Sequence, residues 1–123
     1  MKLLIFGSTG MVGSSLIRTI KKTKSFSPIY PKRSDLDLLN FPKIVEFLNK
    51  VKPDCIVIAA AKVGGIYAND KFPAEFIYEN SVIQNNVIHA AHLSNINKLI
   101  FLGSSCIYPR LAKQPIKEEA LLS

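Results

Sequence analysis

Apolar residues occur along the chain in two patterns, short continuous runs and longer stretches with helical spacing. The short runs predict buried strands, at residues 2–6, 29–30, 55–59 and 99–102. The longer stretches predict amphipathic helices, at residues 11–20, 41–51 and 73–93. Residues 62–70 are expected to form a loop, and Pro28 and Pro31 make the second run the weakest strand candidate.

This alternation predicts an α/β fold with a doubly wound parallel sheet of the Rossmann type. Right-handed crossovers place the carboxyl ends of parallel strands, and hence the ligand crevice, at one edge of such a sheet. The residues that follow each strand are therefore the candidates for function. From Tyr108 onward the alternation stops. The sheet therefore looks unfinished, and we expect residues 1–123 to form one truncated domain of this type.

Three glycines follow the first predicted strand in a GxxGxxG spacing. The first permits a tight turn, the second lets a pyrophosphate approach the backbone, and the third allows close packing of helix on strand. Backbone N–H groups at the helix start then point at phosphate oxygens, and the helix dipole adds to the attraction. A plain glycine turn is the alternative. The predicted dinucleotide contacts are Gly7, Ser8, Thr9, Gly10, Met11, Val12 and Gly13.

The end of the second predicted strand bears on the choice between NAD and NADP. NAD-selective folds place an acidic residue there, which binds the ribose 2′-hydroxyl. This chain has Arg33 and Ser34 instead, and a guanidinium suits a 2′-phosphate. We therefore expect NADP (NADPH) as the cofactor, with NAD less favoured. Asp35 or Asp37 as the ribose acid is the alternative; otherwise Asp37 and Leu38 are expected near the adenine.

The third strand end carries further cofactor candidates. Ala60 and Ala61 are small enough to let a ribose and a pyrophosphate lie against the backbone, although close strand packing is an alternative reason for them. Asn80, early in the long helix, either bonds across to this strand end or is an ordinary surface amide. The fourth strand end is expected to contact the cofactor through Leu102, Gly103, Ser104 and Ser105.

Ser104 and Cys106 are the candidate catalytic residues, on a turn directly after the fourth strand. The Ser104 hydroxyl can hydrogen-bond a carbonyl oxygen as negative charge develops on it. The Cys106 thiol can act as an acid or a base. Each also has a plain structural alternative, because serines cap turns and cysteines fill small apolar spaces.

Composition and charge narrow the function classes. Hydrophobic residues make up 48% of the 123, enough for a core. The longest apolar run is too short to span a bilayer and no signal peptide is recognisable, so we expect a cytoplasmic protein without membrane contact. No metal site is expected, because neither the two cysteines nor the pair His89 and His92 has partners at ligand spacing.

The net charge of +7 is concentrated near the N-terminus. Residues 1–34 hold seven basic residues and no acidic one. Positive potential around one segment favours a small anionic ligand such as a dinucleotide, so no nucleic-acid partner is expected. Solvation of a helix face is the alternative explanation for individual lysines.

Taken together in this order, these segments resemble the extended short-chain dehydrogenase/reductase family. Residues 59–66 (AAAKVGGI), 76–92 and 103–109 (GSSCIYP) resemble, within it, the GDP-L-fucose synthases. The resemblance implies an NADPH-dependent conversion of GDP-4-keto-6-deoxy-D-mannose to GDP-L-fucose, by epimerisation at C3 and C5 and then reduction of the C4 ketone. It also implies a GDP-sugar substrate and, for the full-length parent, a homodimer.

The same resemblance assigns roles to three residues. It makes Cys106 one of the acid/base groups, places Ser104 against the ketone oxygen and gives Arg33 the 2′-phosphate. Relatives of this type often carry a second arginine where Thr9 stands, so the preference for NADP would be weaker here.

The resemblance also implies what lies elsewhere. The family's Tyr-x-x-x-Lys pair, its acid/base histidine and its GDP-sugar domain are expected after Ser123, because neither Tyr78 nor Tyr108 is followed four residues later by lysine. The chain alone is then expected to be inactive. Another nucleotide-sugar epimerase or dehydratase of the superfamily, and a non-enzymatic NADP-binding module, are the alternatives.

Overall fold

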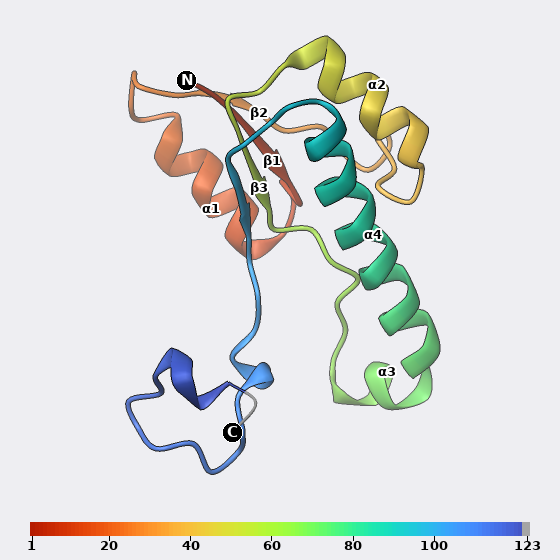
Figure 1. Ribbon diagram of the computed structural model, residues 1–123, viewed down its shortest axis with the longest axis vertical. Helices are drawn as coiled ribbons and strands as arrows, with labels where there is room; N and C mark the ends of the chain where they lie inside the picture. The colour runs from red at the N-terminus through yellow and green to blue at the C-terminus, as the bar shows by residue number, and fades with distance from the viewer. Residues whose placement is uncertain (122–123) are drawn as a thin grey trace.

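The computed structural model describes residues 1–121, and its helices and strands alternate as the sequence predicts (Figure 1). The strands are β1 (Lys2–Phe6), β2 (Ser27–Ile29), β3 (Cys55–Ile58) and β4 (Leu99–Phe101). The α-helices are α1 (Met11–Ile20), α2 (Phe41–Val51), α3 (Ile66–Lys71) and α4 (Pro73–Leu93), and two 3-10 turns are η1 (Ser105–Ile107) and η2 (Glu118–Ala120). All strand pairs are parallel, in the order β2-β1-β3-β4. This confirms the predicted α/β Rossmann fold.

The two central strands are apolar on both faces because helices cover both faces of the sheet (Figure 1). Successive side chains of a strand point to opposite sides. Leu3 and Ile5 of β1 pack with residues of α1, whereas Leu4 and Phe6 pack with residues of α2 and α4. Each such side chain contributes about 1.5–3 kcal/mol when it is fully buried. The packing of this core therefore fixes the position of the carboxyl ends of β1 and β3.

The weak second strand is real but begins earlier than predicted. β2 runs from Ser27 to Ile29 rather than over residues 29–30, and Pro28 stands opposite Leu3 in the parallel register. Proline has no N–H to donate, and an edge strand tolerates it because one side of its backbone needs no partner. The predicted position of this strand was therefore wrong, but the prediction that a strand exists here was right.

The prediction of a loop over residues 62–70 was wrong in its second half, which forms α3. This helix has no buried face, and Ile66 at its start is 92% exposed. The Asn69 side chain donates to the carbonyl oxygens of Gly64 and Gly65, both at 3.1 Å. Local bonds rather than an apolar stripe hold α3, which is why hydrophobic spacing did not reveal it.

β4 lies at the edge of the sheet, beside β3. Leu99 packs against the core, but Ile100 and Phe101 are 52% and 45% exposed. Beyond this strand the chain leaves the sheet and runs through η1 (Figure 1). The last predicted strand is therefore present, but it is not buried as its apolar sequence suggests.

Within residues 1–121, no helix combines the length and the hydropathy that a membrane span requires.

Candidate functional site

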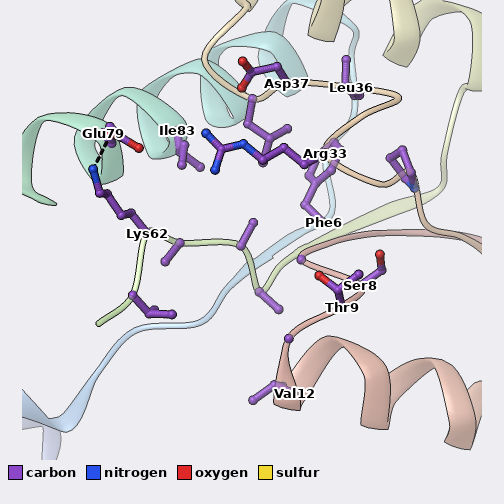
Figure 2. A pocket seen from close by; sticks show the side chains of 18 of the residues that line it. Phe6, Ser8, Thr9, Val12, Arg33, Leu36, Asp37, Lys62, Glu79 and Ile83 are labelled. Atoms are coloured by element: carbon purple, nitrogen blue, oxygen red, sulfur yellow. Dashed lines mark hydrogen bonds and ion pairs between the residues drawn. The ribbon is translucent and has the colours of Figure 1, made fainter. Parts of the chain in front are cut away.

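A pocket of about 560 Å³ lies where β1 and β3 end, at the edge that the topology predicts for a ligand (Figure 2). Three strand-end segments, the start of α1 and one side of α4 enclose it. The lining residues are Phe6, Gly7, Ser8, Thr9, Gly10, Met11 and Val12, then Pro31, Arg33, Leu36, Asp37, Leu38 and Leu39, then Ala59, Ala60, Ala61, Lys62 and Val63, and finally Glu79 and Ile83 of α4.

The local geometry requires glycine at two positions, Gly7 in the turn after β1 and Gly13 in the first turn of α1. Gly7 has a φ of +87°, and a Cβ there would lie 2.4 Å from the carbonyl oxygen of Ala59. A Cβ on Gly13 would lie 2.1 Å from the carbonyl oxygen of Gly7. Both distances are far below van der Waals contact, so side chains at these positions would push the turn off β3 or α1 off the turn. The turn is thus held in one place by its neighbours.

The start of α1 faces this pocket with its backbone groups open to a ligand. Gly10 is the N-cap residue, no side chain caps the helix, and its first turn contains no acidic residue. The positive end of the helix dipole and the N–H groups of the first turn attract an anion placed there. Ser8 and Thr9 line the same wall (Figure 2). This geometry suits a pyrophosphate.

The segment after β2 brings Arg33 to the opposite side of the pocket. Its guanidinium extends into the pocket, and within residues 1–121 no hydrogen bond or ion pair engages it (Figure 2). Buried Leu36 anchors this segment in the core. The carboxylate of Asp37 accepts a bond from the Leu39 N–H at 3.0 Å, also in the pocket lining. Arg33 is therefore a free cation on the pocket wall.

The neighbouring polar residues lie outside this lining. Ser34 donates its hydroxyl to the Asp35 carboxylate at 3.1 Å, and the same carboxylate accepts from the Lys32 N–H at 3.0 Å. Asp35 is thus engaged by its own turn, and Asp37 is the acidic residue of this segment that reaches the pocket.

The end of β3 is tied to α4 by Asn80. Its side-chain oxygen accepts from the Lys62 N–H at 2.7 Å, and its side-chain nitrogen donates to the Lys62 carbonyl at 3.0 Å. Of the two sequence alternatives for Asn80, bonding across to the strand end is therefore the one observed. The ammonium of Lys62 forms an ion pair with Glu79 at the pocket wall (Figure 2).

Sequence reasoning did not place Lys62, Glu79 or Ile83 in the site. The apolar spacing of α4 indicated only a packed helix, and the face that reaches the pocket is set by how α4 sits on the sheet. Adjacent polar residues in the first half of that helix, Glu79 and Asn80, were the available signal.

The candidate catalytic residues lie outside the pocket lining, as do six of the predicted cofactor contacts, with Ser104 belonging to both groups. Ser104 is the N-cap of η1, and its hydroxyl oxygen accepts from the Cys106 N–H at 3.2 Å. Cys106 is exposed with a free thiol, whereas the other cysteine, Cys55, is buried. The predicted residues outside the lining are Gly13, Ser34, Leu102, Gly103, Ser104, Ser105 and Cys106.

The Tyr-x-x-x-Lys spacing also occurs within this chain, at a pair that the sequence analysis did not consider. Tyr67 and Lys71 stand four residues apart on α3, and the Lys71 ammonium lies 5.7 Å from the centroid of the Tyr67 ring. Neither residue lines the pocket, and Tyr67 is exposed. The spacing alone therefore does not identify a pair at the pocket.

The two helix histidines lie in an aromatic stack. The ring of His89 is 5.4 Å from that of Phe41 in α2 and 6.3 Å from that of His92. Among residues 1–121, no group of three or more His, Cys, Asp or Glu side chains is arranged to hold a metal ion.

Known proteins resemble this chain along its whole length. The GDP-L-fucose synthase of Escherichia coli K12 is 47% identical over 121 residues, which cover 98% of this chain and 38% of that protein. The GDP-L-colitose synthase of Yersinia pseudotuberculosis is 40% identical over 123 residues, covering all of this chain and 40% of that protein. The chain thus spans about two fifths of the length of these relatives, and it matches their N-terminal portion.

The fold has a close counterpart among solved structures. The GDP-mannoheptose C4 reductase of Campylobacter jejuni, with NADP bound, superposes with a TM-score of 0.89 at 40% identity. That match covers 98% of this chain and 38% of the reductase. Residues 3–123 also match the model of the NAD dependent epimerase/dehydratase family. The chain therefore belongs to the NAD dependent epimerase/dehydratase family.

Proposed function

We propose that this chain provides the NADPH site and the Ser104 and Cys106 part of the active site in a GDP-sugar epimerase/reductase. The proposed reaction converts GDP-4-keto-6-deoxy-D-mannose to GDP-L-fucose, by epimerisation at C3 and C5 and reduction at C4. The single observation that carries the proposal is the pocket that is lined both by the free guanidinium of Arg33 and by the uncapped start of α1.

The pocket offers separate partners for the two charged parts of NADPH. The glycine turn and the first turn of α1 would hold the pyrophosphate through backbone N–H groups. Arg33 would hold the 2′-phosphate through charge-assisted hydrogen bonds, which are stronger than neutral ones. Leu38 would contact the adenine, and Ala60 and Ala61 would let the cofactor lie against the end of β3. NADP in the related heptose reductase supports this choice of cofactor.

Ser104 and Cys106 would act on the sugar rather than on the cofactor. NADPH, when bound, supplies the hydride for the C4 ketone. The Ser104 oxygen already accepts from the Cys106 N–H, so its own proton remains available to the ketone oxygen. Protons next to a ketone are acidic, and the exposed Cys106 thiol would exchange them at C3 and C5.

Fucose formation is proposed ahead of the other GDP-sugar reactions because of the sequence relationships. The fucose synthase of E. coli is 47% identical to this chain, whereas the colitose synthase and the heptose reductase are each 40% identical. The reactions of those two relatives are the competing outcomes of the test.

A chimera tests the proposal, in which this chain replaces the matching segment of the E. coli GDP-L-fucose synthase. We expect the chimera to form GDP-L-fucose from the 4-keto sugar and NADPH. In deuterated water the product should carry deuterium at C3 and C5. Cys106→Ser should slow this uptake by about 100-fold or more, because it removes one acid/base group, and should slow NADPH oxidation less.

Cys55→Ala is the matched control, since it removes the other thiol, which packs under α1 away from the pocket. It should leave deuterium uptake unchanged. Unchanged uptake in Cys106→Ser would remove Cys106 from the mechanism. A folded chimera that binds NADPH but makes no fucose product would contradict the proposed reaction.

A further inference from the structure

One side-chain amide satisfies both backbone groups of Lys62, although Asn80 lies 18 residues away along the chain. The contact is partly buried, with bonds of 2.7 and 3.0 Å. Removal of the amide would leave an N–H and a carbonyl without their partner at the end of β3. Asn80 therefore fixes the path of the backbone where the strand turns towards α3.

The side chain of Lys62 makes a second tie to the same helix. Its ammonium pairs with Glu79 and lies 5.5 Å from the centroid of the Phe76 ring. The Lys62 and Glu79 side chains are 32% and 24% exposed, so the pair is more shielded than an ordinary surface ion pair. Backbone and side chain of Lys62 are thus both held by the first half of α4.

The segment held in this way forms one wall of the pocket. Residues 59–63 all belong to the lining, and the carbonyl oxygen of Ala59 lies against Gly7 of the glycine turn. A displacement of this wall would therefore change both the width of the pocket and the position of the glycine turn. Asn80 itself is not part of the lining, so any effect on a ligand must pass through Lys62.

We propose that Asn80 is a positioning residue for the dinucleotide, which sets the β3 wall of the pocket through the backbone of Lys62, with the Glu79 ion pair as the second tie. The inference rests on the proposed NADP site and adds a residue that touches no cofactor. A ligand bound to a wall that is already in place avoids the cost of ordering that wall on binding.

The test is the dissociation constant of NADP, measured by titration calorimetry on the 123-residue chain. Asn80→Ala should raise it about tenfold, since both bonds to Lys62 are lost. Asn80→Asp keeps an acceptor for the Lys62 N–H but loses the donor to its carbonyl, and should raise it about three- to tenfold. Asn85→Ala, the same truncation at an exposed site of the same helix, should leave it unchanged.

The ion pair is tested with Glu79→Gln and with the exchanged pair Lys62→Glu/Glu79→Lys. Glu79→Gln should raise the dissociation constant about threefold. The exchanged pair should bring it back to within about twofold of the unsubstituted chain. Normal NADP binding by Asn80→Ala would overturn the positioning role of Asn80, and failure of the exchanged pair to recover affinity would overturn the ion pair as the second tie.

The readout separates positioning from global stability. Titrations are made at a temperature at which scanning calorimetry shows every variant to be folded, where a purely stabilising residue lowers the melting temperature but leaves the dissociation constant unchanged. That pattern in both Asn80 variants would overturn this inference alone. Absence of NADP binding by the unsubstituted chain would instead overturn the proposed function, and this inference with it.

Discussion

Two regions of the sheet are held in place in different ways: the carboxyl ends of the central strands β1 and β3, and the edge strand β4 with the turn that follows it. At the first, strand residues such as Leu4 and Ile56 are fully buried between helices on both faces, and the loops beyond them are locked by close backbone contacts. At the second, Ile100 is half exposed and the following turn has the Ser104 bond as its side-chain tie. The difference teaches that the pocket residues beside β1 and β3 are placed by the core, whereas Ser104 and Cys106 are placed by a local turn.

The largest expected effect comes from matched truncations in the two strands. Ile56→Ala should lower the free energy of unfolding by about 2–5 kcal/mol, because it leaves a cavity in the core. Ile100→Ala should lower it by about 1 kcal/mol or less, because half of that side chain already meets water. Urea unfolding followed by circular dichroism measures both. Equal losses would mean that β4 is as well packed as β3.

A smaller difference in the free energy of unfolding is expected between two glycine substitutions, one near each of these regions. Gly13→Ala should lower the free energy of unfolding by about 1–3 kcal/mol, because its Cβ would overlap the Gly7 carbonyl. It should also weaken NADP binding. At Gly103, after β4, no atom lies within 4 Å of an added Cβ. Gly103→Ala should therefore change the free energy of unfolding by no more than about 0.5 kcal/mol. The same unfolding experiment serves for both. A loss at Gly103 as large as that at Gly13 would contradict the contrast between the two regions.

The same contrast explains how much the sequence could predict. Apolar runs and helical spacing located the elements around the core, because burial on one or two faces determines those patterns. The strand-end rule then placed Arg33 and the glycine turn at one pocket. These features depend on local sequence and on the topology that follows from it.

The remaining features depend on how the helices and strands pack against one another. The spacing of apolar residues along the chain does not determine that packing. Glu79 reaches the pocket only because α4 lies at a particular angle on the sheet, and α3 has no apolar face that would reveal it. The exposure of β4 depends on what covers it rather than on its own apolar residues. The Tyr67 and Lys71 spacing is an opposite case, since the pattern is present but its residues lie outside the pocket.

The central claim is that Arg33 selects NADP by binding its 2′-phosphate, and calorimetric titration of Arg33→Ala with NADP and with NAD tests it most directly. The account predicts that the substitution weakens NADP binding by about 1–3 kcal/mol and leaves NAD binding nearly unchanged. Lys71→Ala removes a lysine outside the pocket and should change neither affinity. Equal losses for the two cofactors in Arg33→Ala would contradict the claim.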